Sequence, residues 1–163
     1  MVTMFRNALT SRIVEFLTAI GIPVVPTQLE GECFLPGIRV EKGSLFVDEA
    51  KLTYPGDLLH EAGHLAVAPS GVRSDLGGEV VIPGADMSAV EVQTTAWAYA
   101  AVTHLRLDPK VLFHEGEYRG ESDGLLFTYG MGVHPGANSL QEIGMTVTGE
   151  MARRLGITPY PTC

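Results

Sequence analysis

The chain has 163 residues, of which 45% are hydrophobic and 18% are charged. This composition excludes an intrinsically disordered chain and predicts one compact domain over residues 1–163 with a hydrophobic core of its own. Its 19 acidic residues outnumber 11 basic ones, giving a formal net charge of −8. Because phosphate backbones attract an excess of positive charge, we expect no nucleic acid as the primary ligand.

The N-terminal residues predict neither a signal peptide nor a membrane span. Arg6, Arg12 and Glu15 interrupt the apolar residues where a signal peptide needs an unbroken apolar core. No run approaches the roughly 18 apolar residues of a transmembrane helix. Cys33 and Cys163 are too few for a disulfide framework. We therefore expect a cytoplasmic protein with reduced cysteines and no membrane partner.

The first part of the chain predicts a helix followed by a β-hairpin. Apolar residues recur at helical spacing over residues 3–20, and Gly21 follows as a C-terminal stop. In residues 37–49, two alternating or β-branched runs flank Lys42-Gly43. This arrangement is typical of two strands joined by a tight turn.

Two helices and one strand are predicted in the middle of the chain. Residues 54–57, Tyr-Pro-Gly-Asp, open a helix that Pro69 ends. Residues 79–83, EVVIP, predict a strand within a Gly-rich segment. Residues 86–107 then predict a long helix, which Pro109 terminates.

The C-terminal part is predicted to be less regular. Glycines at positions 116, 120, 124, 130, 132 and 136 punctuate residues 109–138. Within this stretch, residues 124–130, GLLFTYG, predict a strand, and residues 139–155 predict a last helix. Helices combined with a hairpin and a few further strands indicate an α+β fold.

His60, Glu61 and His64 form an H-E-x-x-H motif within the second predicted helix. Residues four apart lie on one face of a helix, so both imidazoles can bind a single Zn²⁺ ion. Glu61 is offset around the helix, where its carboxylate can reach a water on the metal without binding the metal itself. The motif therefore predicts metal-assisted hydrolysis of a peptide or amide bond, with Glu61 as the general base.

A catalytic zinc ion usually has three protein ligands, so the motif needs a third. Val67 and Ser70 stand where a longer form of the motif has Gly and a third His, which excludes that form. We therefore predict Glu91, on the helix of residues 86–107, as the third ligand. It lies on the apolar stripe of that helix, where a metal would compensate the burial of its charge.

Other interpretations of the third ligand remain open. Ser88 and Glu91 match the S-x-x-E capping box, in which the Glu side chain bonds back to the helix N-terminus. Asp75 and Glu79 are the fallback metal ligands. His104 lies on the opposite side of its helix from Glu91, and we assign it no metal role.

Three residues of the irregular segment can donate a hydrogen bond to a developing oxyanion: His114, Tyr129 and His134. We predict Tyr129 and His134 as transition-state stabilisers. A surface or packing role is the competing interpretation for each of the three.

The H-E-x-x-H helix followed by a Glu-bearing helix resembles the gluzincin group of zinc metallopeptidases. More narrowly, residues 36–107 resemble the ImmA/IrrE-type metallopeptidase domain. The matching segments are GIRVEKGSLFVDEAKL at 37–52, LLHEAGHLAV at 58–67 and EVQTTAWAYAAVTHL at 91–105. The segment after residue 109 matches no part of the family pattern, and we expect no attached DNA-binding domain.

This resemblance implies a zincin-like α+β domain, in which the H-E-x-x-H helix packs on the second ligand-bearing helix beside a small sheet. It also implies His60, His64 and Glu91 as Zn²⁺ ligands and Glu61 as the general base. The leading hypothesis is a zinc-dependent peptidase acting on a peptide or protein substrate. The alternatives are a catalytically silent, zinc-stabilised module that binds a protein partner, and a metal-free packing domain.

Overall fold

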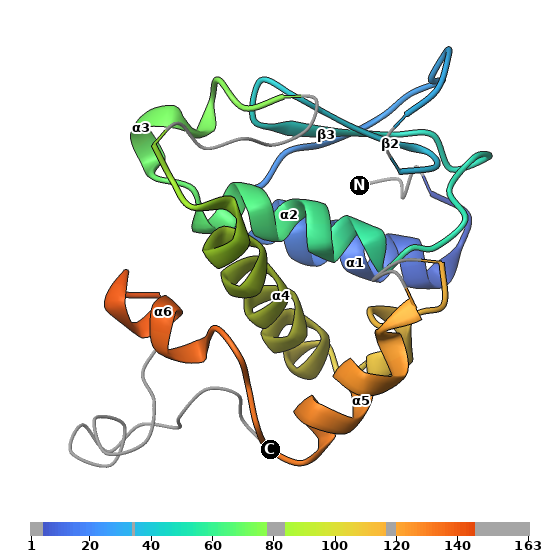
Figure 1. The fold of residues 1–163 in the computed structure, drawn as a ribbon. Coiled ribbons are helices and arrows are strands. Elements are labelled where there is room, and N and C mark those ends of the chain that lie inside the picture. Colours follow the sequence, from blue (N-terminus) through green and yellow to red (C-terminus); the bar gives the residue numbers. More distant parts are fainter. Residues whose placement is uncertain (1–4, 34, 78–83, 117–119, 146–163) are drawn as a thin grey trace. The chain divides into compact units, whose positions relative to one another are not determined.

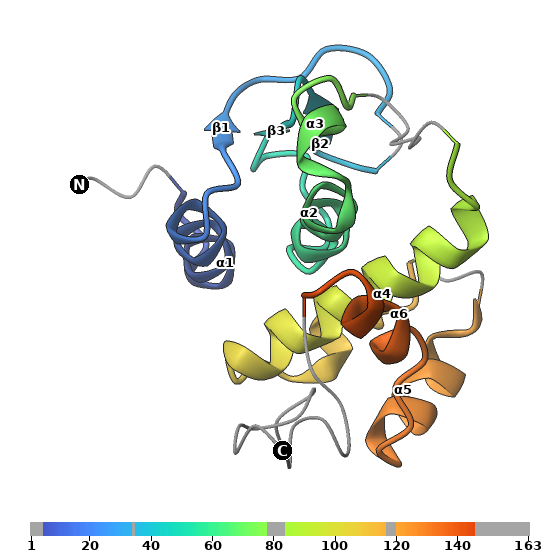
Figure 2. The same cartoon turned by 90° about the vertical axis from the view of Figure 1, so that its left-hand side faces the viewer.

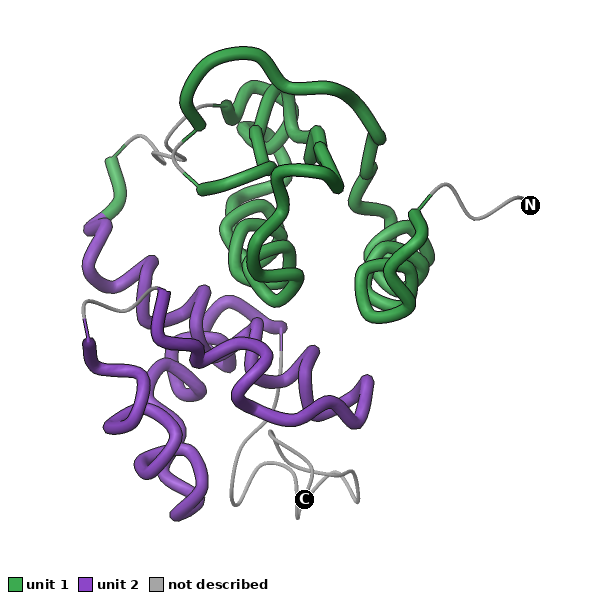
Figure 3. The backbone as a smooth tube through the Cα atoms, turned by 90° about the vertical axis from the view of Figure 1, so that its right-hand side faces the viewer, with its two compact units in different colours: residues 1–85 green, residues 86–163 purple. Residues whose placement is uncertain are grey.

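The computed structural model describes residues 5–33, 35–77, 84–116 and 120–145, shown in Figure 1 and Figure 2. These ranges contain six α-helices, one 3-10 helix and a three-stranded sheet, which confirms the α+β class. The chain divides into two compact units, residues 1–85 and 86–163 (Figure 3). That the two units form one domain stays a prediction.

Unit 1 combines a small sheet with three helices. Its elements are α1 (Ala8–Ala19), β1 (Val24–Pro26), β2 (Ile38–Glu41), β3 (Ser44–Val47), α2 (Asp57–Val67) and α3 (Ser70–Arg73). The strands lie in the order β1-β3-β2, with β1 parallel and β2 antiparallel to β3. Figure 2 shows α1 and α2 side by side on one face of this sheet. The sequence predicts α1, the hairpin and α2, but neither β1 nor α3.

Two side chains fix the beginning of α1. The Asn7 side chain accepts hydrogen bonds from the backbone N–H groups of Leu9 and Thr10 at 2.9 and 3.0 Å. The carboxylate of Glu49 accepts two more, from the backbone N–H groups of Arg6 and Asn7, at 3.0 and 2.8 Å. Because these groups satisfy the donors that a helix N-terminus leaves open, α1 begins directly after Asn7, later than predicted.

The hairpin forms as its sequence predicts. Lys42 and Gly43 have φ values of 48° and 73°, and a two-residue type I′ turn requires positive φ at both positions. The buried cross-strand pairs are Ile38 with Val47 and Val40 with Leu45. Since side chains alternate across a strand, these pairs place all four apolar residues on one face of the sheet.

Gly43 also packs closely against the segment that follows α2. Its backbone N–H donates to the carbonyl oxygen of Leu76 at 3.0 Å. A Cβ at this position would lie 2.7 Å from the carbonyl oxygen of Arg73, too close for a real contact. We expect Gly43→Ala to lower the free energy of unfolding by about 2–4 kcal/mol, because backbone strain and overpacking add. Urea unfolding of the full chain measures this loss.

Gly21→Ala is the matched control for this substitution. Gly21 also has a positive φ, 93°, but nothing lies within 4 Å of the Cβ it would gain. Its substitution should therefore cost only the left-handed backbone, about 1–2 kcal/mol. Equal losses for the two variants would contradict a packing role for Gly43.

The second helix of unit 1, α2, is almost wholly buried. Every residue of it except Ala66 is buried, and Pro69 follows its C-terminus as predicted. The guanidinium of Arg73, in α3, donates to three carbonyl oxygens at this end: Leu65 at 2.7 Å, Ala66 at 3.3 Å and Ala68 at 3.0 Å. Carbonyls in the last turn of a helix lack intrahelical donors, and a cation there complements the helix dipole. Arg73 therefore caps α2.

Unit 2 is helical in its described residues. It contains α4 (Met87–His104), a 3-10 helix (Pro109–Val111), α5 (Ser122–Gly130) and α6 (Ala137–Glu142). Both α6 and the 3-10 helix contact α4. The long predicted helix is confirmed as α4, but it ends before Pro109, because Arg106 has a φ of 54°.

Two predictions for unit 2 are wrong in part or in full. The strand predicted over residues 124–130 is the helix α5, since a short apolar run does not distinguish the two. The last helix begins at Ala137 and ends at Glu142, short of the predicted end, because Gly144 follows with a φ of 78°. Residues 146–155 of that prediction, and the strand predicted over 79–83, lie outside the described residues. None of the described helices has the length and apolarity needed to span a membrane.

Candidate metal centre

The H-E-x-x-H motif lies in the middle of α2. Its two imidazole rings have centroids 5.0 Å apart and meet edge to face, with an interplanar angle of 81°. His60, Glu61 and His64 are 3%, 8% and 8% exposed. The predicted helix therefore brings two buried imidazoles together, with a buried carboxylate beside them.

A further acidic residue shares this face of α2. Asp57 is 2% exposed and precedes Glu61 by four positions. At 100° per residue, Asp57, His60, Glu61 and His64 fall within an arc of about 100°. Two carboxylates four residues apart on a helix repel each other, and burial strengthens the repulsion. A cation at the imidazoles would offset it. Asp57 was not predicted as a site residue, although its spacing from Glu61 is visible in the sequence.

The beginning of α4 tests the capping-box role of Glu91. Asp86 is the N-cap of this helix, and its side chain accepts a hydrogen bond from the backbone N–H of Ser88 at 3.0 Å. Ser88 therefore lies inside the helix, and Glu91 stands beyond the third helical position that a capping box requires. The capping-box alternative is wrong.

The surroundings of Glu91 differ from the prediction. Thr95, Ala98 and Val102, which share its stripe on α4, are buried as expected. Glu91 itself is exposed, because it lies in the second turn, near the N-terminal end of that stripe. Burial of its charge therefore does not support a metal ion at Glu91. The prediction of Glu91 as a metal ligand depends instead on the chemistry of its carboxylate.

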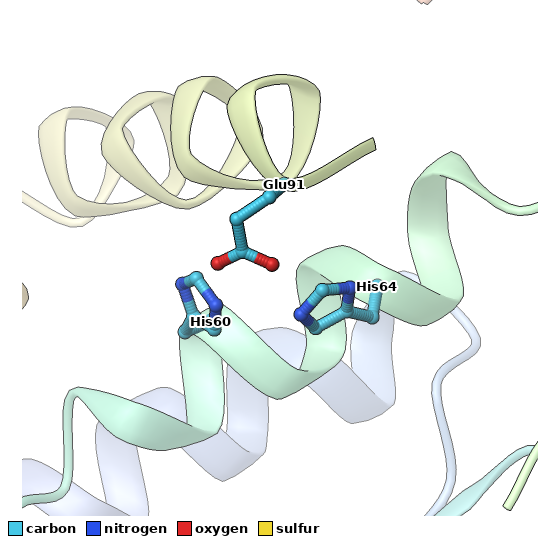
Figure 4. Close-up of side chains that lie close together, drawn as sticks. All are labelled: His60, His64 and Glu91. Carbon is cyan, nitrogen blue, oxygen red and sulfur yellow. The ribbon is translucent and has the colours of Figure 1, made fainter. Parts of the chain in front are cut away.

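His60, His64 and Glu91 each offer one ligand atom within 4.8 Å of the other two, and Figure 4 shows the carboxylate directed toward both rings. Imidazole nitrogen and carboxylate oxygen are ligands that Zn²⁺ accepts, at bond lengths of about 2.0–2.2 Å. The donor set of the three residues, two imidazole nitrogens and one carboxylate oxygen, therefore fits the ion. Asp75 is not a member of this group, and Glu79 lies outside the described residues.

Tyr129 and His134 lie in an aromatic cluster of unit 2. Their ring centroids are 5.5 Å apart, and both rings contact Tyr99, at 4.5 and 5.6 Å. Phe113 completes the cluster, 5.2 Å from the Tyr129 ring. The Tyr129 hydroxyl donates to the carbonyl oxygen of Pro135 at 3.0 Å. The Tyr129 hydroxyl would have to give up this bond to donate to a developing oxyanion. A transition-state role for Tyr129 or His134 stays a prediction.

The two titratable groups of the cluster are shifted by their surroundings. Burial raises the pKa of Tyr129 above its usual range, and the nearby Tyr99 adds to the rise. Partial burial lowers the pKa of His134, while a hydrogen bond involving the Tyr129 backbone opposes this shift. Both shifts favour the neutral form of the side chain.

The two remaining histidines of the described chain do not belong to the group of His60, His64 and Glu91 that could hold a metal ion. His114 is half-buried, and its Nδ1 accepts a hydrogen bond from the backbone N–H of Gly116 at 3.1 Å. His104 is exposed at the C-terminal end of α4. The hydrogen bond to Gly116 supports a loop-packing role for His114.

Comparison of the chain with models of protein families, with curated proteins and with solved structures found no match. The resemblance to the gluzincins therefore depends on the H-E-x-x-H motif and on the two helices that carry the predicted ligands. The case for a function comes from the chemistry of these side chains.

Proposed function

We propose that this protein is a zinc-dependent metallopeptidase of the gluzincin type, with His60, His64 and Glu91 as metal ligands and Glu61 as the general base. One observation carries the proposal: two buried imidazoles on α2 have ring centroids 5.0 Å apart, with Glu61 directly after the first. The proposed substrate is a peptide or protein segment. Its proposed setting is the cytoplasm, where the free thiol of Cys33 stays reduced.

The residues of the motif divide the chemistry between them. When bound, Zn²⁺ would polarise the scissile carbonyl and lower the pKa of a water molecule toward about 7. His60 and His64 would hold the ion through one nitrogen each. Glu61 accepts the proton of the attacking water and donates it to the leaving amine. Because Glu61 is buried, little bulk water competes for this proton.

Metal content and metal-linked stability test the proposal. We expect the purified protein to bind about one equivalent of Zn²⁺. Removing it with EDTA should lower the unfolding midpoint, since free metal at 1,000 times its Kd stabilises a folded chain by about 4.1 kcal/mol. Elemental analysis and thermal unfolding provide the two measurements. Less than a tenth of an equivalent of zinc, with the same midpoint in EDTA, would contradict a metal centre.

A catalytically silent, zinc-stabilised module that binds a protein partner is the second candidate. One observation favours it: Phe127, Met131 and Val133 of unit 2 are 70%, 68% and 58% exposed. Exposed large apolar side chains are a feature that protein-binding surfaces share. The two candidates differ in whether the biological activity depends on Glu61. A peptidase needs this residue, and a silent binding module does not.

A further inference from the structure

Asp57 is a buried acid that the proposed peptidase chemistry leaves without a role. It occupies the first turn of α2, one turn before His60 and Glu61, and is 2% exposed. A buried carboxylate is costly unless charged or hydrogen-bonding groups compensate it. The position of Asp57 on the metal-binding face of α2 indicates which groups these are.

Asp57 and His60 are both buried and stand three positions apart on α2. Because side chains on a helix lean toward its N-terminus, we expect the imidazole of His60 to lie over the turn that contains Asp57. Residues three apart have Cβ atoms about 5–6 Å from each other, a separation that a carboxylate and an imidazole readily bridge. An imidazole that binds a metal through one nitrogen carries a proton on the other, and that N–H needs an acceptor.

We propose that Asp57 is a positioning residue, whose carboxylate accepts the hydrogen bond from the ring N–H of His60 that faces away from the metal. This bond fixes the ring plane and leaves the other nitrogen deprotonated for the ion. The inference rests on the proposed metal centre and adds a residue to it. A competing role exists, because an acid in the first turn also stabilises the helix dipole, with or without a metal.

Asp57→Asn tests the role, because it keeps the shape of the side chain and removes its charge. We expect the Zn²⁺ affinity of the full chain to fall 10–100-fold, the usual loss when a residue that hydrogen-bonds a metal ligand is replaced. Competition with a chromophoric chelator measures the affinity. The visible absorption bands of the Co²⁺-loaded variant should shift as well, because the orientation of an imidazole about the ion changes.

Asp57→Glu separates positioning from the helix dipole. It keeps the negative charge in the first turn but moves the carboxylate outward by one methylene. A positioning role predicts weaker Zn²⁺ binding for this variant too, whereas a dipole role predicts wild-type affinity. The variant also provides the test if Asp57→Asn does not fold.

Asp48→Asn is the matched control. Asp48 is a buried acid of the same unit whose side chain accepts from the backbone N–H groups of Leu29 and Ala50, at 3.0 and 3.1 Å. Its substitution should lower stability and leave Zn²⁺ affinity and the Co²⁺ spectrum unchanged. Wild-type affinity and spectrum in both Asp57 variants would overturn the positioning role and leave the metal centre standing. Wild-type protein that binds neither ion would overturn the metal centre and, with it, the role of Asp57.

Discussion

Glu61→Gln is expected to abolish peptide hydrolysis while the protein keeps its metal. The amide has nearly the shape of the carboxylate but cannot accept the proton of the attacking water. General acid–base catalysis contributes about 10²–10⁴-fold to a rate, so turnover should fall by at least this range. Cleavage of a fluorogenic peptide library by the zinc-loaded variant and wild type, at equal metal content, measures the loss.

Glu49→Gln controls for the loss of a negative charge in unit 1. Glu49 caps α1 through the backbone N–H groups of Arg6 and Asn7, so its substitution should reduce stability without reducing turnover. Cleavage by Glu61→Gln at the wild-type rate would exclude Glu61 as the base. A wild-type protein with a full equivalent of zinc and no cleavage of any peptide in the library would instead favour the silent module.

His64→Ala is expected to abolish stable zinc binding. Loss of an imidazole removes a metal bond and not only an orienting contact, so the affinity should fall by more than the 10–100-fold typical of residues that hydrogen-bond a ligand. The purified variant should retain less than a tenth of an equivalent of zinc, as measured by elemental analysis. Its unfolding midpoint should no longer respond to EDTA.

Two further variants test which side chains hold the metal. His104→Ala removes an exposed histidine at the end of α4 and should keep the zinc content of the wild type. Glu91→Gln keeps the size of the third proposed ligand and removes its charge, so it should also weaken binding. If His64→Ala loses the metal and Glu91→Gln binds as tightly as the wild type, the histidine pair holds the ion with a different third ligand.

Local signals in the sequence were sufficient to predict the hairpin and α2. The turn at Lys42-Gly43 needs two positive φ values, and the prolines at positions 55 and 69 bracket a helix. The H-E-x-x-H motif lies in α2, so the imidazole pair could also be predicted. The spacing of His60 and His64 on a helix leaves their rings little freedom to lie apart.

Elements defined by distant contacts could not be predicted. β1 has only three residues, none of them buried, and exists because it pairs in parallel with β3. α5 is held through one buried ring, Tyr129, whose neighbours Tyr99 and Phe113 come from other parts of the chain. The role of Glu91 also depended on the start of α4, because both Asp86 and Ser88 are good N-cap residues and only the structure shows which one is used.

The contact between Arg73 and the end of α2 has a consequence for the imidazole pair. A guanidinium presents several N–H donors in one rigid plane, so a single side chain can engage three acceptors that a lysine ammonium would reach only in part. Arg73, which lies outside α2, thereby caps the C-terminus of this helix. The backbone of Arg73 also lies close to the hairpin turn at Gly43. The helix that carries the two imidazoles is thus connected to the hairpin turn through a residue outside the five-residue motif, so we expect substitutions at Arg73 to affect the imidazole pair from a distance.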